Sequence, residues 1–274
     1  PLASSVGNQA GIYNGIGNAG TPGSRYWSTG AQDAAGNFWM IGGYGADSAG
    51  NEDYLNDLWE WNGTTWTWMS GSSTIQAKGV YSGAGAVPGA RIGANSWFDS
   101  SGNFWLFGGL AYDVNGNVGV MNDLWKFTPG TSTWTFVSGS QTNEAGANFG
   151  TQGIPDSTNV PGSRSFATSW KTANGDVWIL GGSGVGGRYF NDLWKYSQGE
   201  WTWMDGSELS DQLGIYTGSA STLAPGSRQQ GAAWSDGNGN IWLMGGFGLG
   251  LLPTQLNNLH TGFNSLQDLW EFQP

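Results

Sequence analysis

Pro88-Gly-Ala-Arg91, Phe104-Trp-Leu-Phe-Gly-Gly109, Asp123-Leu-Trp125 and Trp134-Thr-Phe136 follow one another along a single stretch of the chain. The first three motifs occur four times in this order and the last occurs three times, and the opening arginines are Arg25, Arg91, Arg164 and Arg228. Successive arginines are 66, 73 and 64 residues apart. A pattern that returns at a steady period is the signature of one repeated supersecondary unit. We therefore expect four repeats rather than one irregular domain.

Each repeat predicts four antiparallel strands. The first strand starts at the arginine and ends at a hairpin turn such as Asp99-Ser-Ser-Gly-Asn103, where glycine supplies the positive φ of a tight turn. The run Phe104–Phe107 has no polar alternation, which is typical of a strand covered on both faces. The Gly-Gly pair is predicted to end this second strand and to let a neighbouring segment approach closely. Asp-Leu-Trp and Trp-Thr-aromatic are predicted to be strands three and four.

Most of the tryptophans recur in register with the repeat, which favours a packing role. The chain has 18 tryptophans. We assign them to strand one (Trp27, Trp97, Trp170, Trp234), to the position three residues before Gly-Gly (Trp39, Trp105, Trp178, Trp242), to Asp-Leu-Trp (Trp59, Trp125, Trp194, Trp270) and to the closing strand (Trp66, Trp134, Trp201). Trp61, Trp68 and Trp203 lie outside this register. A glycan-binding protein would be expected to expose aromatic residues outside the register.

Four-stranded antiparallel sheets that repeat and are apolar on both faces pack around an axis as a β-propeller. The opening arginine, the Gly-Gly pair, the aromatic third strand and the tryptophan of the fourth strand resemble the kelch repeat. Asp-Leu-Trp departs from the tyrosine-centred third strand of that family. The chain is also similar to bacterial kelch-type proteins with long interblade loops, within the galactose-oxidase-like propellers. The predicted fold class is all-β, a kelch-type propeller of four repeats, with strand one innermost.

The repeats are expected to form one domain over residues 1–274, or a four-blade portion of a larger propeller. Their predicted bounds are about 22–87, 88–160, 161–224 and 225–274, and 1–21 is predicted to be an interblade loop. The last blade lacks its own outer strand. Three explanations remain open: a piece of a longer propeller, a compact four-bladed ring, or chains that associate as homo-oligomers through the exposed edge. Within the chain, residues 1–6 are the candidate to cover that edge, beside Asp268–Phe272.

The long loops are predicted to gather at one end of the blades, where function usually lies. They connect strand two to three, after Gly43 and Gly246, and strand four to one, over 71–87, 139–160 and 206–224. They carry the aromatic residues Tyr13, Tyr81, Phe149 and Tyr216, which are candidate ligand contacts or staples that hold each loop. The arginines Arg25, Arg91, Arg164 and Arg228 start the innermost strand at the same end. They are candidates for an anion-binding ring, or for clamps on Asp57, Asp123, Asp192 and Asp268.

Metal and cofactor chemistry finds little support in the sequence, and no cofactor is expected. The loops 47–53 and 113–117 hold alternate Asp and Asn residues that could bind Ca²⁺, although stabilisation of the turns is the favoured explanation. The galactose oxidase resemblance implies a copper site with two histidines and a cysteine-linked tyrosine. His260 is the sole histidine and there is no cysteine, so that site is not expected. Asp205, Glu208 and Asp211 are the acids considered for glycoside hydrolysis, but we expect no enzyme.

The net charge of the chain disfavours some classes of binding partner. The net charge is −11 and the pI is about 4.2, whereas nucleic acids and anionic membranes attract basic proteins. No stretch approaches the ~20 apolar residues of a membrane span. The acidic, lysine-poor composition is typical of secreted microbial proteins. We expect a secreted or cell-surface module that binds protein or glycan and performs no catalysis. The alternatives are a self-assembling structural subunit and, less favoured, a carbohydrate-active enzyme.

Overall fold

The computed structural model describes residues 8–219, 223–236, 239–250 and 263–272. The described residues are organised in antiparallel sheets, and their only helical segments are the short 3-10 turns Pro129–Thr131 and Val185–Gly187. The all-β prediction is confirmed. The chain divides into two compact units, residues 1–145 and 146–274. The division falls in the loop predicted between the second and third repeats, and the prediction of one domain over 1–274 stays a prediction.

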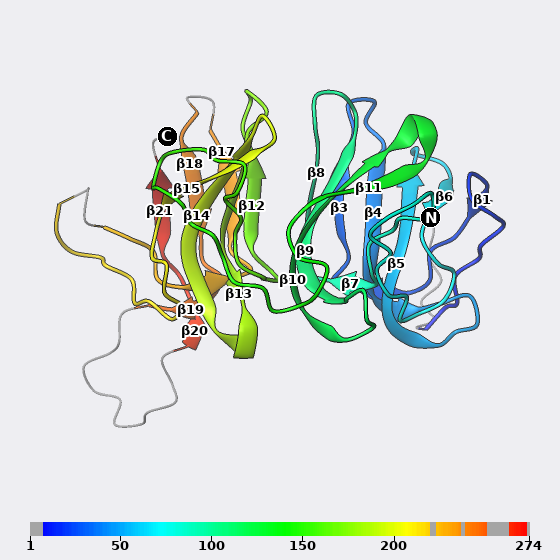
Figure 1. Cartoon of the computed structure of the whole chain (residues 1–274), viewed down its shortest axis with the longest axis horizontal. Coiled ribbons are helices and arrows are strands. Elements are labelled where there is room, and N and C mark those ends of the chain that lie inside the picture. Colours follow the sequence, from blue (N-terminus) through cyan, green and yellow to red (C-terminus); the bar gives the residue numbers. More distant parts are fainter. Residues whose placement is uncertain (1–7, 220–222, 237–238, 251–262, 273–274) are drawn as a thin grey trace. The chain divides into compact units, whose positions relative to one another are not determined.

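The first repeat forms a sheet in unit 1 with the order β1-β6-β5-β4-β2, in which β3 also pairs with β4 (Figure 1). Its strands are β1 (Ala19–Gly20), β2 (Arg25–Tyr26), β3 (Thr29–Gln32), β4 (Phe38–Ala46), β5 (Glu52–Trp61) and β6 (Trp66–Ser70). The prediction that residues 1–21 form only a loop is wrong at β1, which pairs with the outer edge of β6. The exposed backbone edge of β6 supplies the reason, since it offers hydrogen bonds to any adjacent segment.

The second repeat completes unit 1 with a sheet in the order β11-β10-β9-β7, in which β8 also pairs with β9. Its strands are β7 (Arg91–Ile92), β8 (Asn95–Phe98), β9 (Phe104–Tyr112), β10 (Val118–Thr128) and β11 (Thr133–Ser138). The hairpin turns are as predicted, because the Asp99 amide donates to the Asn103 carbonyl and Gly102 has a φ of 78°.

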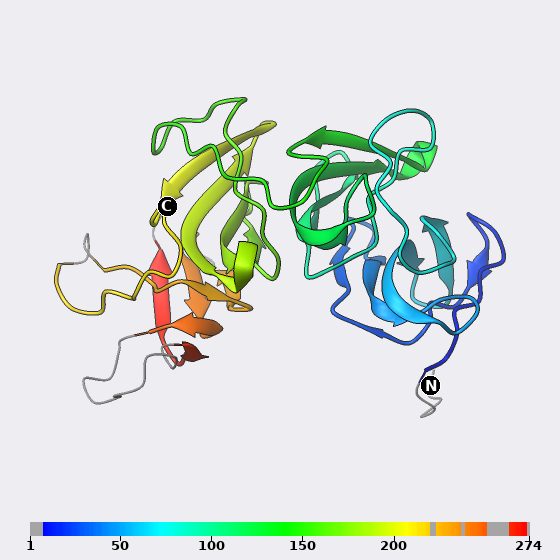
Figure 2. The ribbon, with the colours of Figure 1, turned by 60° about the horizontal axis from the view of Figure 1, so that its bottom comes forward.

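Unit 2 holds the third and fourth repeats. The third forms a meander of β12 (Thr168–Lys171), β13 (Val177–Ser183), β14 (Tyr189–Ser197) and β15 (Glu200–Asp205). The fourth is split into two small sheets, with the orders β16-β19-β20 and β17-β18-β21. Their strands are β16 (Arg228–Gln229), β17 (Ala232–Ser235), β18 (Ile241–Met244), β19 (Phe247–Leu249), β20 (Phe263–Ser265) and β21 (Leu269–Phe272). Figure 2 shows β21, in red, beside the orange β18.

The first strand of each repeat is interrupted two residues after its arginine. Trp27 takes a φ of 58°, and Gly93, Phe166 and Gln230 take the same left-handed conformation at equivalent positions. This break corrects the assignment of Trp27. Trp97 pairs with Trp105, whereas the residue opposite Trp39 is Ala31. Trp27 therefore lies outside the register of the other strand-one tryptophans.

The Gly-Gly pair marks a β-bulge in the first three repeats, and the prediction that it ends strand two is wrong there. The register of β4 against β5 shifts between Ile41 and Gly43, and the hairpin continues to a short turn over 47–51. Positive φ at both glycines creates the bulge without breaking the pairing. The loop predicted from strand two to three is thus largely a hairpin. The predicted close approach is confirmed, since a Cβ on Gly42 would lie 2.6 Å from the Arg91 carbonyl oxygen.

Aromatic side chains between the sheets form the core of each unit. In unit 1, the ring of Trp39 on β4 lies 5.6 Å from the ring of Phe98 and 6.4 Å from that of Phe104, both on the second sheet. In unit 2, Trp170 and Trp178 stack at 6.1 Å and belong to a cluster with Ile241 of the fourth repeat. Burial of such large rings supplies much of the hydrophobic stabilisation. Each unit therefore joins two repeats through a shared core.

Candidate functional site

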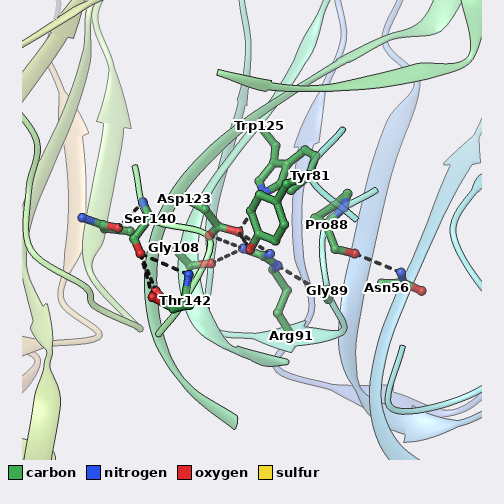
Figure 3. A network of polar contacts seen from close by, with 11 residues as sticks. Asn56, Tyr81, Pro88, Gly89, Arg91, Gly108, Asp123, Trp125, Ser140 and Thr142 are labelled. Atoms are coloured by element: carbon green, nitrogen blue, oxygen red, sulfur yellow. Dashed lines mark hydrogen bonds and ion pairs between the residues drawn. The ribbon is translucent and has the colours of Figure 1, made fainter. Parts of the chain in front are cut away.

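Each opening arginine holds the aspartate of Asp-Leu-Trp in its own repeat, and Figure 3 shows the pair of the second repeat. Arg91 Nη1 and Nη2 donate to the two carboxylate oxygens of Asp123, both at 2.8 Å. Its Nε donates to the Gly89 carbonyl at 2.9 Å and its Nη1 to the Gly108 carbonyl at 2.8 Å. A two-pronged ion pair with further carbonyl partners satisfies a guanidinium that is removed from water.

The other three repeats contain the same clamp. The two bonds measure 2.6 and 2.7 Å from Arg25 to Asp57, 2.7 Å each from Arg164 to Asp192, and 2.7 and 2.6 Å from Arg228 to Asp268. The arginine side chains are 4% exposed or less. The prediction of one clamp per repeat is confirmed. An additional contact between these arginines and a ligand stays a prediction.

The aromatic candidates of the long loops pack onto these clamps. Tyr81 donates its hydroxyl to Asp123 at 2.9 Å, and Tyr13 and Tyr216 donate to Asp57 and Asp268 at 2.6 and 2.7 Å. Phe149 has no hydroxyl, and its ring lies 5.2 Å from that of Trp194. Burial, together with the neighbouring carboxylate, raises the pKa of Tyr216 to about 12. These contacts match the staple interpretation, while direct ligand contact by the four residues stays untested.

The loops considered for calcium are closed by their own carboxylates. Asp47 Oδ1 accepts the amides of Ala49 and Asn51 at 2.8 and 2.9 Å, and Asp113 holds its turn in the same way. These bonds lower the pKa of Asp47, although its burial acts in the opposite direction. The geometry is that of an Asx turn. Among the described residues, no group of three or more acidic or histidine side chains is placed to hold a metal ion.

The three acids considered for catalysis have different surroundings. Asp211 pairs with Arg188 at 3.0 Å near the surface, and its other oxygen accepts the Tyr189 amide. Asp205 lines a cavity beside β21, and Glu208 lies on an adjoining turn. His260 is outside the described residues. The described residues include no helix long and apolar enough to cross a membrane.

A row of aromatic rings in unit 1, exposed at Tyr26 and Trp27 and half-buried along the rest, was not predicted. Trp27 and Tyr26 are 51% and 52% exposed, and their ring centroids lie 4.7 Å apart. The row continues from Tyr26 to Tyr44 at 5.3 Å, to Tyr54 at 6.0 Å and to Tyr112 at 5.9 Å. It lies at the end of the sheets where the arginine-initiated strands begin. We call these five residues the aromatic row.

Acidic and amide groups border the aromatic row. Asp53 accepts the Tyr54 amide at 2.6 Å and the Gln76 side-chain amide at 2.6 Å, and Glu52 beside it is exposed. Burial first, and then the charge of Asp53, raises the pKa of both Tyr54 and Tyr112. The hydroxyls of Tyr54 and Tyr112 are therefore protonated near neutral pH. The local signal in the sequence is the off-register pair Tyr26-Trp27, which the assignment of Trp27 to strand one concealed.

Comparison with known proteins adds a structural likeness. No protein-family model matches the chain, and no curated protein matches it. Many solved structures resemble it, with 226 matching chains. One of them is described as the structure of YjhT, with a TM-score of 0.54 and 15% sequence identity. The match covers 89% of this chain and 73% of that one. At this level of identity the likeness concerns the fold alone.

Proposed function

We propose that the protein is a kelch-type β-propeller, or part of one, and that it acts as a non-catalytic binding module. The in-register arginine clamps, the Gly-Gly bulges and the four-stranded meander of the third repeat support the propeller assignment. Such scaffolds present loops and strand ends for recognition. The acidic, lysine-poor composition supports a secreted or cell-surface location.

The aromatic row is the observation that carries this proposal. Exposed Trp and Tyr side chains that gather in one place mark interaction surfaces, because they lose little conformational freedom on binding. Trp27 adds backbone strain to exposure. A left-handed conformation costs a residue with a side chain ~1–2 kcal/mol, and Phe166 and Gln230 take it as well at the equivalent positions, so the exposure of a large aromatic side chain is what sets Trp27 apart. Gly93 holds the equivalent position of the second repeat at a φ of 61°, so the fold itself does not require a tryptophan there.

A glycan is the partner that the surroundings of the row favour, and a protein is the alternative. The slightly positive C–H face of a sugar packs on the electron-rich face of an aromatic ring. The Tyr hydroxyls, the Gln76 amide and the carboxylate of Glu52 offer hydrogen bonds to sugar hydroxyls. The row is bordered by carboxylates, so an acidic glycan would be repelled and a neutral one accepted.

The test is a screen of neutral oligosaccharides with the unmodified protein, followed by calorimetry on any glycan that binds. We expect Trp27→Gly to weaken binding by at least about tenfold and to leave the thermal midpoint unchanged or raised, because glycine relieves the strain. Trp234→Ala is the matched control, since Trp234 is 44% exposed but lies in unit 2. Equal affinity of the Trp27→Gly variant, or no binding to any neutral glycan, would contradict glycan recognition by the row.

A further inference from the structure

The outer edge of β21 is uncovered among the described residues. β21 pairs with β18 on one side, and no described strand pairs with its other side. The equivalent strands β5, β10 and β14 each lie between two partners, the outer ones being β6, β11 and β15. Leu269 is 56% exposed, whereas Leu58, Leu124 and Leu193 at the same position are buried. An edge of this kind is a template for an additional strand.

The tyrosine beside this edge, Tyr216, has one aromatic partner fewer among the described residues than the equivalent residues of the other repeats. Tyr13 contacts the rings of both Trp59 and Trp68, and its two ring contacts measure 5.1 and 5.0 Å. Tyr81 likewise contacts Trp125 and Phe136, and Phe149 contacts Trp194 and Trp203. Among the described residues, Tyr216 contacts the Trp270 ring at 5.1 Å and no second ring.

A cavity of about 690 Å³ occupies the place of the missing ring. Tyr216, Asp268, Trp270 and Phe272 line it, together with Met204 and Ile241. The Asp268 side chain is 12% exposed toward solvent, while the aspartates of the other clamps are 1% exposed or less. Sites that bind ligands typically measure ~300–1,000 Å³. We call this cavity and the adjoining β21 edge the acceptor groove.

The other repeats specify what fits the acceptor groove. In the second repeat, Trp134 lies opposite Phe127, and Phe136 lies opposite Trp125. The third repeat repeats this register with Trp201 opposite Tyr196 and Trp203 opposite Trp194. Phe272 and Trp270 occupy the corresponding positions on β21. A Trp-Thr-aromatic strand is therefore the segment whose two rings match both halves of the groove.

We propose that the acceptor groove binds, antiparallel to β21, an extended Trp-Thr-aromatic segment supplied by another polypeptide chain. Its first ring packs opposite Phe272 and its second ring lies opposite Trp270, against Tyr216. Main-chain hydrogen bonds to the β21 edge supply affinity, and the two rings supply specificity, as in other strand-addition sites. This proposal concerns unit 2 and does not depend on glycan binding by the aromatic row.

Two peptides test the proposal by calorimetry with the whole protein, one with the sequence of residues 199–207 and one with that of 132–140. We expect saturable 1:1 binding of both peptides, since each carries the Trp-Thr-aromatic pattern. The second aromatic residue is Trp in the 199–207 peptide and Phe in the 132–140 peptide. The 199–207 peptide with both tryptophans replaced by alanine should not bind. Slower amide exchange over Leu269–Phe272 in the complex should locate the bound peptide at the edge. Equal binding of the alanine peptide, or unchanged exchange at these amides, would overturn the proposal.

Protein variants separate the groove from the rest of unit 2. Tyr216→Ala should weaken the 199–207 peptide by about two- to twelvefold, the range of one edge-to-face ring contact. Tyr189→Ala is the control, because Tyr189 contacts Phe263 at 4.9 Å and does not line the cavity. Slow exchange without peptide at those amides of Leu269–Phe272 that face away from β18 would mean that the edge is already covered. This result would overturn the proposal that another chain supplies the occupant. A dimer in sedimentation would then identify a second copy of the chain as the occupant of the edge, and a monomer would identify a segment of the same chain. Residues 1–6, predicted above for that role, lie outside the described residues.

Discussion

At the scale of the residue, one carboxylate organises each repeat. Asp123 Oδ2 accepts hydrogen bonds from Arg91, from the Tyr81 hydroxyl and from the Trp125 indole N–H at 2.7 Å. The arginine neutralises the buried charge, and the neutral donors satisfy the remaining lone pairs. A buried ion pair is favourable only when its hydrogen bonds are completed in this way. The clamp therefore joins strand one, strand three and the preceding long loop at a single point.

Loss of one clamp arginine should strongly destabilise unit 2. Arg164→Ala leaves Asp192 buried without its countercharge, and we expect the free energy of unfolding to fall by about 3 kcal/mol. Arg188→Ala is the matched control, because the Arg188 side chain is 66% exposed and its ion pair should contribute less than about 1 kcal/mol. Urea denaturation of both variants measures the difference. Equal midpoints for the two variants would argue against the clamp as a source of stability.

At the scale of the element, glycine conformation lets long strands cross from one end of a sheet to the other. Gly42 and Gly43 take φ values of 64° and 103°, and the register shift at this point turns the strand without ending it. The missing side chain at Gly42 leaves room for the Arg91 carbonyl of the next repeat. The bulge thus serves both the hairpin β4–β5 and the contact between two repeats.

Alanine at the bulge should cost more than alanine in an open turn. Gly42→Ala combines an unfavourable φ with a clash against the Arg91 carbonyl, and we expect a loss of about 3 kcal/mol in the free energy of unfolding. Gly63 also has a positive φ, of 93°, but a Cβ at this position would meet no atom of a non-adjacent residue within 4 Å. Gly63→Ala should therefore lose only about 1 kcal/mol. Thermal denaturation of the two variants measures how much the clash at Gly42 adds to the loss of stability. Equal losses would mean that the positive φ alone causes the destabilisation.

At the scale of the whole molecule, repeated tyrosine–carboxylate contacts make stability sensitive to alkaline pH. Burial is the largest cause that raises the pKa of Tyr13, Tyr81 and Tyr216 above the ordinary value of 10.0, and the aspartate each one contacts adds to it. The protonated hydroxyl is favoured by the folded state. A group with a raised pKa stabilises fully below its unfolded value and loses that contribution as pH rises toward the folded value.

The free energy of unfolding should accordingly fall as pH rises above the ordinary tyrosine pKa of 10.0, through the pKa of about 12 for Tyr216 and beyond. Urea titrations at about pH 8, 10 and 11 measure this slope. Tyr81→Phe should flatten it, and the change should be tolerated sterically because Phe149 occupies the equivalent position in the third repeat. An unchanged slope in the Tyr81→Phe variant would show that other groups control the alkaline response.

Local spacing and recurrence along the chain were enough to predict the repeat, the strand order and, as one of two alternatives, the clamps. The in-register arginines and aspartates match one to one, and an ion pair between strands that start at the same end follows from antiparallel geometry. The hairpin turns follow from Asp, Asn and Gly chemistry, which acts within a few residues. Each of these features is visible in one chain because it depends on residues close together in sequence or on their repetition.

Packing of the sheets was needed to place Trp27, to define the role of Gly-Gly and to reveal the uncovered edge of β21. Arg25 and Trp27 are two residues apart whereas Arg91 and Trp97 are six apart, but only the pairing of Ala31 with Trp39 fixed the register. A bulge and a strand end have the same glycines, and contacts with the next strand distinguish them. The aromatic row and the acceptor groove bring together residues distant in sequence, and such proximity arises only when the sheets pack.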